Sequence, residues 1–309
     1  MPKPSFFIVG APKCGTTAMC KYLNRHPEIY IPRIKEINYF GTDFKWKIKA
    51  KNLEEYLAFF DDGLGKICGE GSPSYFYSKQ AATEIYNLNP DAKIIIMLRE
   101  PVSLLYSFHS QKLFNGSSED IQDFREALEA EPERRLGKRI PKKCKSANQL
   151  FYTDVVKFTE NIQRYFDKFG RERVHIIIYD DFIADLPKVY EKTLKFLEVD
   201  STFQTEFNRI NSNKKVRNVA LQKLLKYPPA KILEFGKFLL PLPRSMRRSI
   251  LERVKGSLKS FNTQKVKRPP LDPEYRRSLQ KKFAPEVEKL SILLERDLTN
   301  WSQSSDNSY

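Results

Sequence analysis

Cysteine and histidine are scarce in this chain, and neither is grouped as a site would require. The four cysteines contain no C-x-x-C pair, and the three histidines are scattered over 309 residues. This pattern indicates neither a zinc site nor a disulfide framework. It favours reduced thiols, which are typical of a cytoplasmic protein.

Long apolar runs are absent as well. No stretch of about 18 or more apolar residues could span a bilayer, and the first apolar run starts too close to the N-terminus to leave room for a signal peptide. Internal repeats and low-complexity segments are also lacking. With 40% hydrophobic residues, the chain is predicted to be a soluble globular protein with a sizeable core.

Acidic residues are outnumbered by basic ones. The chain has 54 Lys and Arg against 38 Asp and Glu, a net charge of +16. Such a field attracts phosphates, sulfated sugars, nucleic acids or anionic membranes. No aromatic-rich RNA-binding motif is present, which argues against nucleic acid as a partner. The charge therefore favours an anionic ligand without selecting one.

Four apolar runs alternate with helical patterns, which predicts an α/β fold with a central parallel sheet. The runs are at residues 6–9, 66–69, 93–98 and 174–179, and the helices are expected at residues 78–88, 101–114, 147–169 and 186–198. Residues 115–146 are expected to form a charged, solvated insertion. We predict an α/β domain over residues 1–222 and a helical C-terminal extension over 223–309, packed on the same domain or completing it.

The most informative segment runs from Gly10 to Thr17 and reads G-A-P-K-C-G-T-T. It has the glycine spacing of the Walker A loop, G-x-x-x-x-G-K-[ST], but Thr16 occupies the lysine position and Lys13 lies inside the loop. An apolar run precedes it and a helical segment follows. The unpaired N–H groups at a helix N-terminus bind anions, so this loop is predicted to bind phosphate without splitting ATP.

A second phosphate clamp is predicted around Arg99 and Ser107. Arg99 follows the apolar run 93–98, and Pro101 suits the first turn of the helix that carries Ser107. Ligands of open α/β sheets bind outside the carboxyl ends of the strands, and an arginine fork with a hydroxyl suits phosphate. The alternative is an Arg99 paired with a nearby carboxylate and a Ser107 on the helix surface.

These two motifs, in this order, resemble the 5′- and 3′-phosphate sites of sulfotransferases that use 3′-phosphoadenosine 5′-phosphosulfate. The closer match is the carbohydrate branch, which includes heparan sulfate sulfotransferases and bacterial relatives. Other matching segments are Leu23–Pro27, Lys35–Phe40 (the family's K-E-x-x-[FY]-F), Gly69–Tyr75, Phe196–Leu197 and Pro269–Leu271. The resemblance implies a P-loop-containing fold with a central parallel β-sheet flanked by helices, plus the helical C-terminal extension.

The resemblance also implies roles for individual residues. Lys13 would stabilise the leaving group as a catalytic residue, and Glu36 would be the catalytic base. The donor would be held by Lys13, Cys14, Gly15, Thr16, Thr17, Arg99 and Ser107. Sulfuryl transfer needs no metal to neutralise charge, so none is expected.

On the acceptor side the predicted residues are Lys35, Glu70, Ser72 and His109, with His109 also a rival base. The family often has lysine after its Gly-Glu pair, where this chain has Gly71. A turn ended by Pro73 explains Glu70 and Ser72 equally well.

Two basic segments complete the predictions. Lys215 and Arg217 lie in a segment that resembles the loop covering the adenine and the 3′-phosphate, although a solvated basic loop is the alternative. The basic amphipathic segment 224–258 could contact a membrane or line an acceptor groove, with core packing as the alternative.

The predicted function is in-line sulfuryl transfer from 3′-phosphoadenosine 5′-phosphosulfate to a hydroxyl or amine. The acceptor is expected to be a carbohydrate or a small metabolite. Two alternatives are a P-loop kinase-like phosphotransferase, against which Thr16 argues, and a non-catalytic binder of polyanions or nucleic acid.

Overall fold

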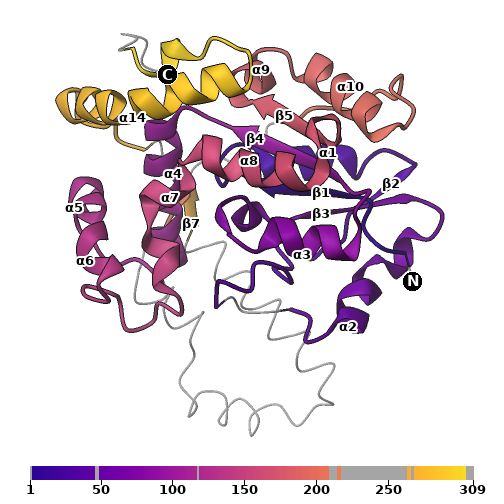
Figure 1. The fold of residues 1–309 in the computed structure, drawn as a ribbon, viewed down its shortest axis with the longest axis horizontal. Helices are drawn as coiled ribbons and strands as arrows, with labels where there is room; N and C mark the ends of the chain where they lie inside the picture. Colours follow the sequence, from indigo (N-terminus) through magenta and orange to yellow (C-terminus); the bar gives the residue numbers. More distant parts are fainter. Residues whose placement is uncertain are drawn as a thin grey trace, which may run out of the picture.

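The computed structural model describes residues 2–45, 49–116, 118–208, 214–216, 263–265 and 268–303. A five-stranded sheet of order β2-β3-β1-β4-β5 lies at the centre, and all its pairings are parallel. Its strands are β1 (Phe6–Gly10), β2 (Ile29–Tyr30), β3 (Ile67–Gly71), β4 (Lys93–Leu98) and β5 (Val174–Ile178). Helices lie on both faces (Figure 1), which confirms the predicted α/β fold.

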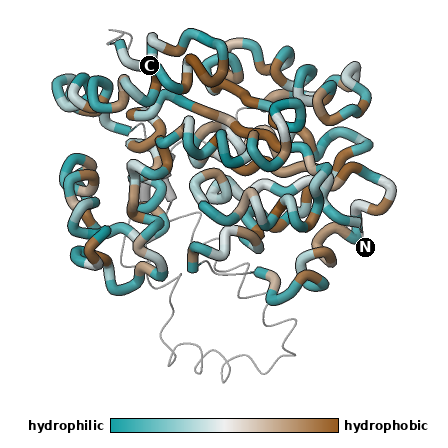
Figure 2. The backbone as a smooth tube through the Cα atoms, viewed as in Figure 1, coloured by the Kyte–Doolittle hydropathy of each residue, from teal (hydrophilic) through white to brown (hydrophobic). Residues whose placement is uncertain are grey.

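The strands form where apolar residues run without interruption. All five residues of β1 are buried, as are five of the six in β4, so both faces of these central strands are covered. Figure 2 shows the hydrophobic segments gathered at this sheet. Strand β2 was not predicted. Its two residues pair only with β3 at the edge, and so short a strand carries no periodicity of its own.

The main helices begin near their predicted starts. They are α1 (Thr16–Leu23), α3 (Ala81–Leu88), α4 (Pro101–Asn115) and α10 (Leu186–Leu197). Helix α4 begins where expected because Glu100 caps it, accepting from Val102 N at 3.0 Å and Ser103 N at 2.8 Å, with Pro101 in the first turn. The helix expected over 147–169 is instead divided into η3 (Ala147–Leu150), α7 (Tyr152–Val155) and α8 (Phe158–Phe169).

Shorter elements connect these. They are α2 (Leu53–Leu57), η1 (Ala58–Gly63), η2 (Pro73–Tyr77), α5 (Phe124–Glu129), α6 (Glu131–Arg135), η4 (Arg171–Arg173) and α9 (Tyr179–Ala184). An antiparallel pair joins β6 (Lys214–Val216) to β7 (Thr263–Lys265).

The segment 115–146 differs from the solvated insertion expected of it. Helices α5 and α6 lie within it, and the Arg134 and Glu119 side chains are fully buried. Arg134 donates to both Glu119 oxygens at 2.8 and 2.7 Å, and Tyr152 Oη donates to Glu119 at 2.7 Å. A bidentate pair with a third donor compensates the two buried charges, so a basic sequence does not exclude burial here.

The C-terminal helix α14 (Pro273–Leu293) packs against α8 and α4. It buries Leu279, Phe283, Val287 and Leu290. Beyond it, η5 (Thr299–Trp301) places Trp301 Nε1 2.6 Å from Asp180 Oδ2, at the start of α9. Residues 223–262, which include the basic segment 224–258, lie outside the described residues. Within the described part of the chain, no helix is long and apolar enough to cross a membrane.

Candidate functional site

The glycine loop connects β1 to α1 and has an unusual backbone. Lys13 and Gly15 have positive φ angles of 68° and 92°. At Gly15 an added Cβ would lie 3.1 Å from the Phe182 ring, so glycine is favoured there by both conformation and space. Gly15 is the N-cap of α1 and has no side chain to cap it. The N–H groups of Thr16 and Thr17 are therefore available to an anion, whereas that of Ala18 donates to the Gly15 carbonyl oxygen at 2.8 Å.

Lys13 lies in a strongly positive environment. Its Nζ donates to Gln111 Oε1 of α4 at 3.1 Å. Burial lowers the pKa of Lys13 to about 8, with a further decrease from the positive charges of Arg268 and Arg99, which Glu36 opposes. Lys13, Arg99, Arg268 and Glu36 are therefore close enough to influence one another. Residues from four separate segments meet at this point.

The second predicted clamp gains a third residue. Arg99 follows β4, and its guanidinium lies 4.6 Å from the Tyr179 ring centre. Ser107, buried on α4, accepts a hydrogen bond at 3.2 Å from Arg268, whose guanidinium lies 4.8 Å from the Tyr106 ring centre. Arg268 was not predicted from the sequence. The only signal was its position just before the matching segment Pro269–Leu271.

Lys35 and Glu36 project from a loop whose neighbouring residues are buried. Both are exposed, whereas Ile37 and Phe40 belong to the core. Lys35 Nζ donates to Thr17 Oγ1, which ties this loop to the start of α1. Glu36 has a positive φ of 54°. The structure therefore brings Lys35 and Glu36 beside the glycine loop.

Glu70 and Ser72 are placed differently from the acceptor contacts expected of them. Glu70 is 2% exposed and Ser72 is 0% exposed. Glu70 accepts from the hydroxyls of Tyr56, Ser72 and Tyr75 at 2.6, 2.5 and 2.9 Å. Burial raises the pKa of Glu70, and these three donors oppose the rise. Because their polar atoms are occupied inside the protein, the two side chains do not face an open acceptor surface.

His109 and Cys14 are also enclosed. His109 is 2% exposed, its Nε2 lies 2.9 Å from the Ile121 carbonyl oxygen, and burial lowers its pKa. It thus anchors the chain after α4 instead of reaching an acceptor. Burial raises the pKa of Cys14 to about 12, so its thiol stays neutral. Thr16 is buried at the start of α1.

Gly71 lies where the structure has little room for a side chain. A Cβ added at Gly71 would lie 2.5 Å from the sulfur of Cys20, a buried residue of α1. Any larger residue at this position would displace α1 or the cysteine.

Two further predictions fall partly or wholly outside the described residues. Lys215 pairs with Gln264 in the β6–β7 ladder, but its side chain is not described. Arg217 lies outside the described part of the chain.

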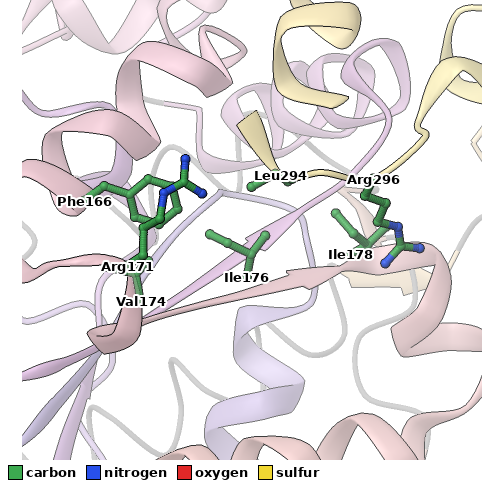
Figure 3. A pocket seen from close by; sticks show the side chains of 7 residues that line it. All are labelled: Phe166, Arg171, Val174, Ile176, Ile178, Leu294 and Arg296. Carbon is green, nitrogen blue, oxygen red and sulfur yellow. The ribbon is translucent and has the colours of Figure 1, made fainter. Parts of the chain in front are cut away.

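A pocket of about 260 Å³ lies beside β5 (Figure 3). It is lined by Phe166, Arg171, Val174, Ile176, Ile178, Leu294 and Arg296. Its two arginines are engaged, Arg171 with the Leu293 carbonyl at 3.0 Å and Arg296 with Asp181. None of the predicted site residues lines it. Among the described residues, no group of three or more His, Cys, Asp or Glu side chains could hold a metal ion.

Comparison with known proteins identifies the family of the chain. Residues 3–238 match the sulfotransferase domain, so the chain belongs to the sulfotransferase family. The crystal structure of a sulfotransferase from Alicyclobacillus acidocaldarius is similar, with a TM-score of 0.70 and 26% identity, and the match covers 98% of this chain and 100% of that one.

Curated relatives are more distant. Heparan sulfate glucosamine 3-O-sulfotransferase 5 of Mus musculus is 27% identical over 210 residues, which cover 66% of this chain and 57% of that protein. The membrane-associated sulfotransferase kil1 of Dictyostelium discoideum is 35% identical over 124 residues, 38% of this chain and 26% of that protein. The matches thus span between a quarter and three fifths of these relatives' own lengths.

Proposed function

We propose that this chain transfers a sulfuryl group from 3′-phosphoadenosine 5′-phosphosulfate to an acceptor hydroxyl or amine. The observation that carries the proposal is the convergence of Lys13, Arg99 and Arg268 beside an uncapped helix N-terminus. A donor with phosphates at both ends of a nucleoside needs two separate anion sites. Like charges held this close are stabilised when such an anion binds between them.

The residues divide into two groups in this mechanism. Arg99, Ser107 and Arg268 hold the 3′-phosphate. Lys13 and the first turn of α1 hold the 5′-phosphosulfate, where Lys13 also contacts the bridging oxygen. Charge develops on that oxygen as the bond to sulfur breaks, and a preorganised ammonium stabilises it.

Glu36 completes the reaction as general base. It takes the proton from the acceptor hydroxyl while the acceptor oxygen bonds to sulfur and adenosine 3′,5′-bisphosphate leaves from the opposite side. Its exposure and its loop position favour this role, because a base must reach a bound acceptor. Lys35, tied to Thr17, lies on the side from which the acceptor enters.

A carbohydrate is the proposed acceptor. The names of the curated relatives, which include a heparan sulfate glucosamine 3-O-sulfotransferase and carbohydrate sulfotransferase 15 of Mus musculus, support a sugar hydroxyl. The net charge of +16 also suits an anionic sugar. Small metabolites are the alternative.

Calorimetric titration with adenosine 3′,5′-bisphosphate tests the donor site. Arg99→Ala should weaken binding at least about tenfold, because a hydrogen bond to a charged group contributes about 1.5–3 kcal/mol. The matched control is Lys188→Ala, which removes one positive charge from the exposed surface of α10 and should leave the affinity unchanged. No binding by the unaltered protein, or equal weakening in both variants, would overturn the proposal.

Turnover tests the chemistry. The donor is incubated with a library of sugars and small metabolites, and product masses are compared with those of the acceptors. We expect a gain of one sulfuryl group on at least one sugar, without added metal. If only small metabolites gave products, the proposed donor would stand and the proposed carbohydrate acceptor would be wrong.

A further inference from the structure

The loop that carries Glu36 is held in place by hydroxyl groups of residues outside the loop. Tyr75 Oη lies 2.9 Å from Tyr39 N and 3.2 Å from Phe40 N, and Ser72 Oγ lies 3.3 Å from Asn38 N. A backbone N–H can only donate, so both hydroxyl oxygens must act as acceptors. Three consecutive N–H groups of the loop therefore end on two side chains of the β3–η2 segment.

Glu70 determines the direction of these hydrogen bonds. Each hydroxyl has a single proton, and the Ser72 and Tyr75 protons both point at Glu70 Oε1, at 2.5 and 2.9 Å. Tyr56 Oη donates to the other oxygen at 2.6 Å. Because the carboxylate takes these protons, the oxygens of Ser72 and Tyr75 are left to accept from the loop. A side chain without oxygen atoms at this position, such as methionine, would leave both protons without this acceptor.

The loop requires such support because its backbone is unfavourable. Glu36 and Asn38 have positive φ values of 54° and 53°, which are uncommon for residues other than glycine. Such conformations persist only where the surroundings impose them. Glu36 lies between two attachments, the contact of Lys35 with Thr17 on one side and the hydroxyl contacts of residues 38–40 on the other.

We propose that Glu70, acting through Tyr75 and Ser72, is a positioning residue that sets the backbone from which Glu36 reaches the acceptor. The inference rests on the proposed function for the role of Glu36, but the hydrogen bonds that hold the loop do not depend on that function. It gives the buried carboxylate of the Gly-Glu-Gly-Ser segment a role in the reaction without contact with substrate.

Tyr75→Phe tests the proposal because it keeps the ring and removes the acceptor. The matched control is Tyr190→Phe, which removes the hydroxyl of another buried tyrosine. Tyr190 lies on α10, and its hydroxyl contacts the Tyr22 carbonyl oxygen at 3.3 Å. In Tyr75→Phe, kcat should fall at least about tenfold, since a small displacement of a catalytic group has an effect of this size. The dissociation constant of adenosine 3′,5′-bisphosphate should stay within about twofold, as the phosphate sites are unchanged. Tyr190→Phe should match the unaltered protein in both.

A double-mutant cycle separates positioning from general damage. In a Glu36→Ala background, Tyr75→Phe should change the residual turnover less than about twofold, because its effect passes through Glu36. A further tenfold loss there overturns the proposal. If Glu36→Ala alone leaves kcat unchanged, the proposed base is wrong instead, which distinguishes the two failures.

Amide hydrogen exchange gives a readout that needs no activity. The Tyr39 and Phe40 amides should exchange at least about tenfold faster in Tyr75→Phe and in Glu70→Met, and at the original rate in Tyr190→Phe. Unchanged protection in Glu70→Met would show that the carboxylate does not organise the loop, whether or not the enzyme turns over.

Discussion

Lys13 combines a left-handed backbone with a buried ammonium beside two arginines. Its pKa of about 8 lies within an accessible pH range, so its charge can be followed. The protonated form binds an anion, and a bound anion raises the pKa by favouring that form. Binding above pH 8 must therefore be accompanied by proton uptake at Lys13.

This gives a prediction for the pH dependence of binding. The affinity for adenosine 3′,5′-bisphosphate should be constant below the free pKa of about 8 and fall by up to about tenfold per pH unit above it, until the pKa of the complex is reached. Titration in buffers of different ionisation enthalpy measures the proton uptake directly. Lys13→Arg, which stays charged, should bind without this dependence. An equal decline in that variant would assign the titration to another group.

At this scale the sequence indicated local motifs but not contacts between distant segments. The spacing within Gly10–Thr17 and from Arg99 to Ser107 located residues that the fold does bring together. Arg268 could not be found, because it is 161 positions from the serine it contacts. Glu70 and Ser72 were expected on the acceptor side because the segment Gly69–Tyr75 resembles the family. Their burial follows from the position of β3 between β2 and β1, which no local pattern reveals.

Among the elements, the segment of α5 and α6 depends on one buried ion pair. Arg134→Met should lower the free energy of unfolding by about 3–5 kcal/mol, because Glu119 is left as a buried charge without its partner. Urea denaturation measures the loss. Replacing both residues, as in Arg134→Met with Glu119→Leu, should recover much of it.

The control for this prediction is an exposed pair in the same segment. Arg139 and Glu126 are 37% and 55% exposed, so Arg139→Met should cost less than about 1 kcal/mol. Equal losses in the two single variants would contradict the role assigned to burial.

Long apolar strands and capped helices were the elements most readily predicted. Strands β1, β4 and β5 carry continuous apolar runs, and Pro101 marks the start of α4. The region 147–169 reads as one helix because its apolar residues persist throughout. It is divided because Tyr152 turns inward to Glu119, a tertiary contact that overrides local propensity.

In the whole molecule, the C-terminal residues complete the structure formed by the N-terminal ones. Arg276 contacts Glu100, the N-cap of α4, at 2.9 Å. Arg268 contacts Ser107 on the same helix. Residues near the C-terminus therefore hold α4 at two points. The predicted extension is thus joined, in its described part, to the core of the α/β domain.

Two apolar residues of α14 test this integration. Leu290 is 0% exposed and Ile292 is 78% exposed, so Leu290→Ala should cost about 2–5 kcal/mol and Ile292→Ala less than about 0.5 kcal/mol. Circular dichroism and tryptophan fluorescence should shift together in Leu290→Ala, because one cooperative unit loses stability. Separate transitions would indicate that α14 unfolds by itself.

The contact between Gly71 and Cys20 restricts how this site can change. The sulfur lies 2.5 Å from where a Cβ at Gly71 would stand, so any side chain at Gly71 requires the Cys20 side chain to move. Exchange of Cys20 for a smaller residue would provide the space, although by itself it leaves a void in the core. Substitutions at the two positions are therefore coupled, and the stability lost by a change at Gly71 should depend on the residue at position 20.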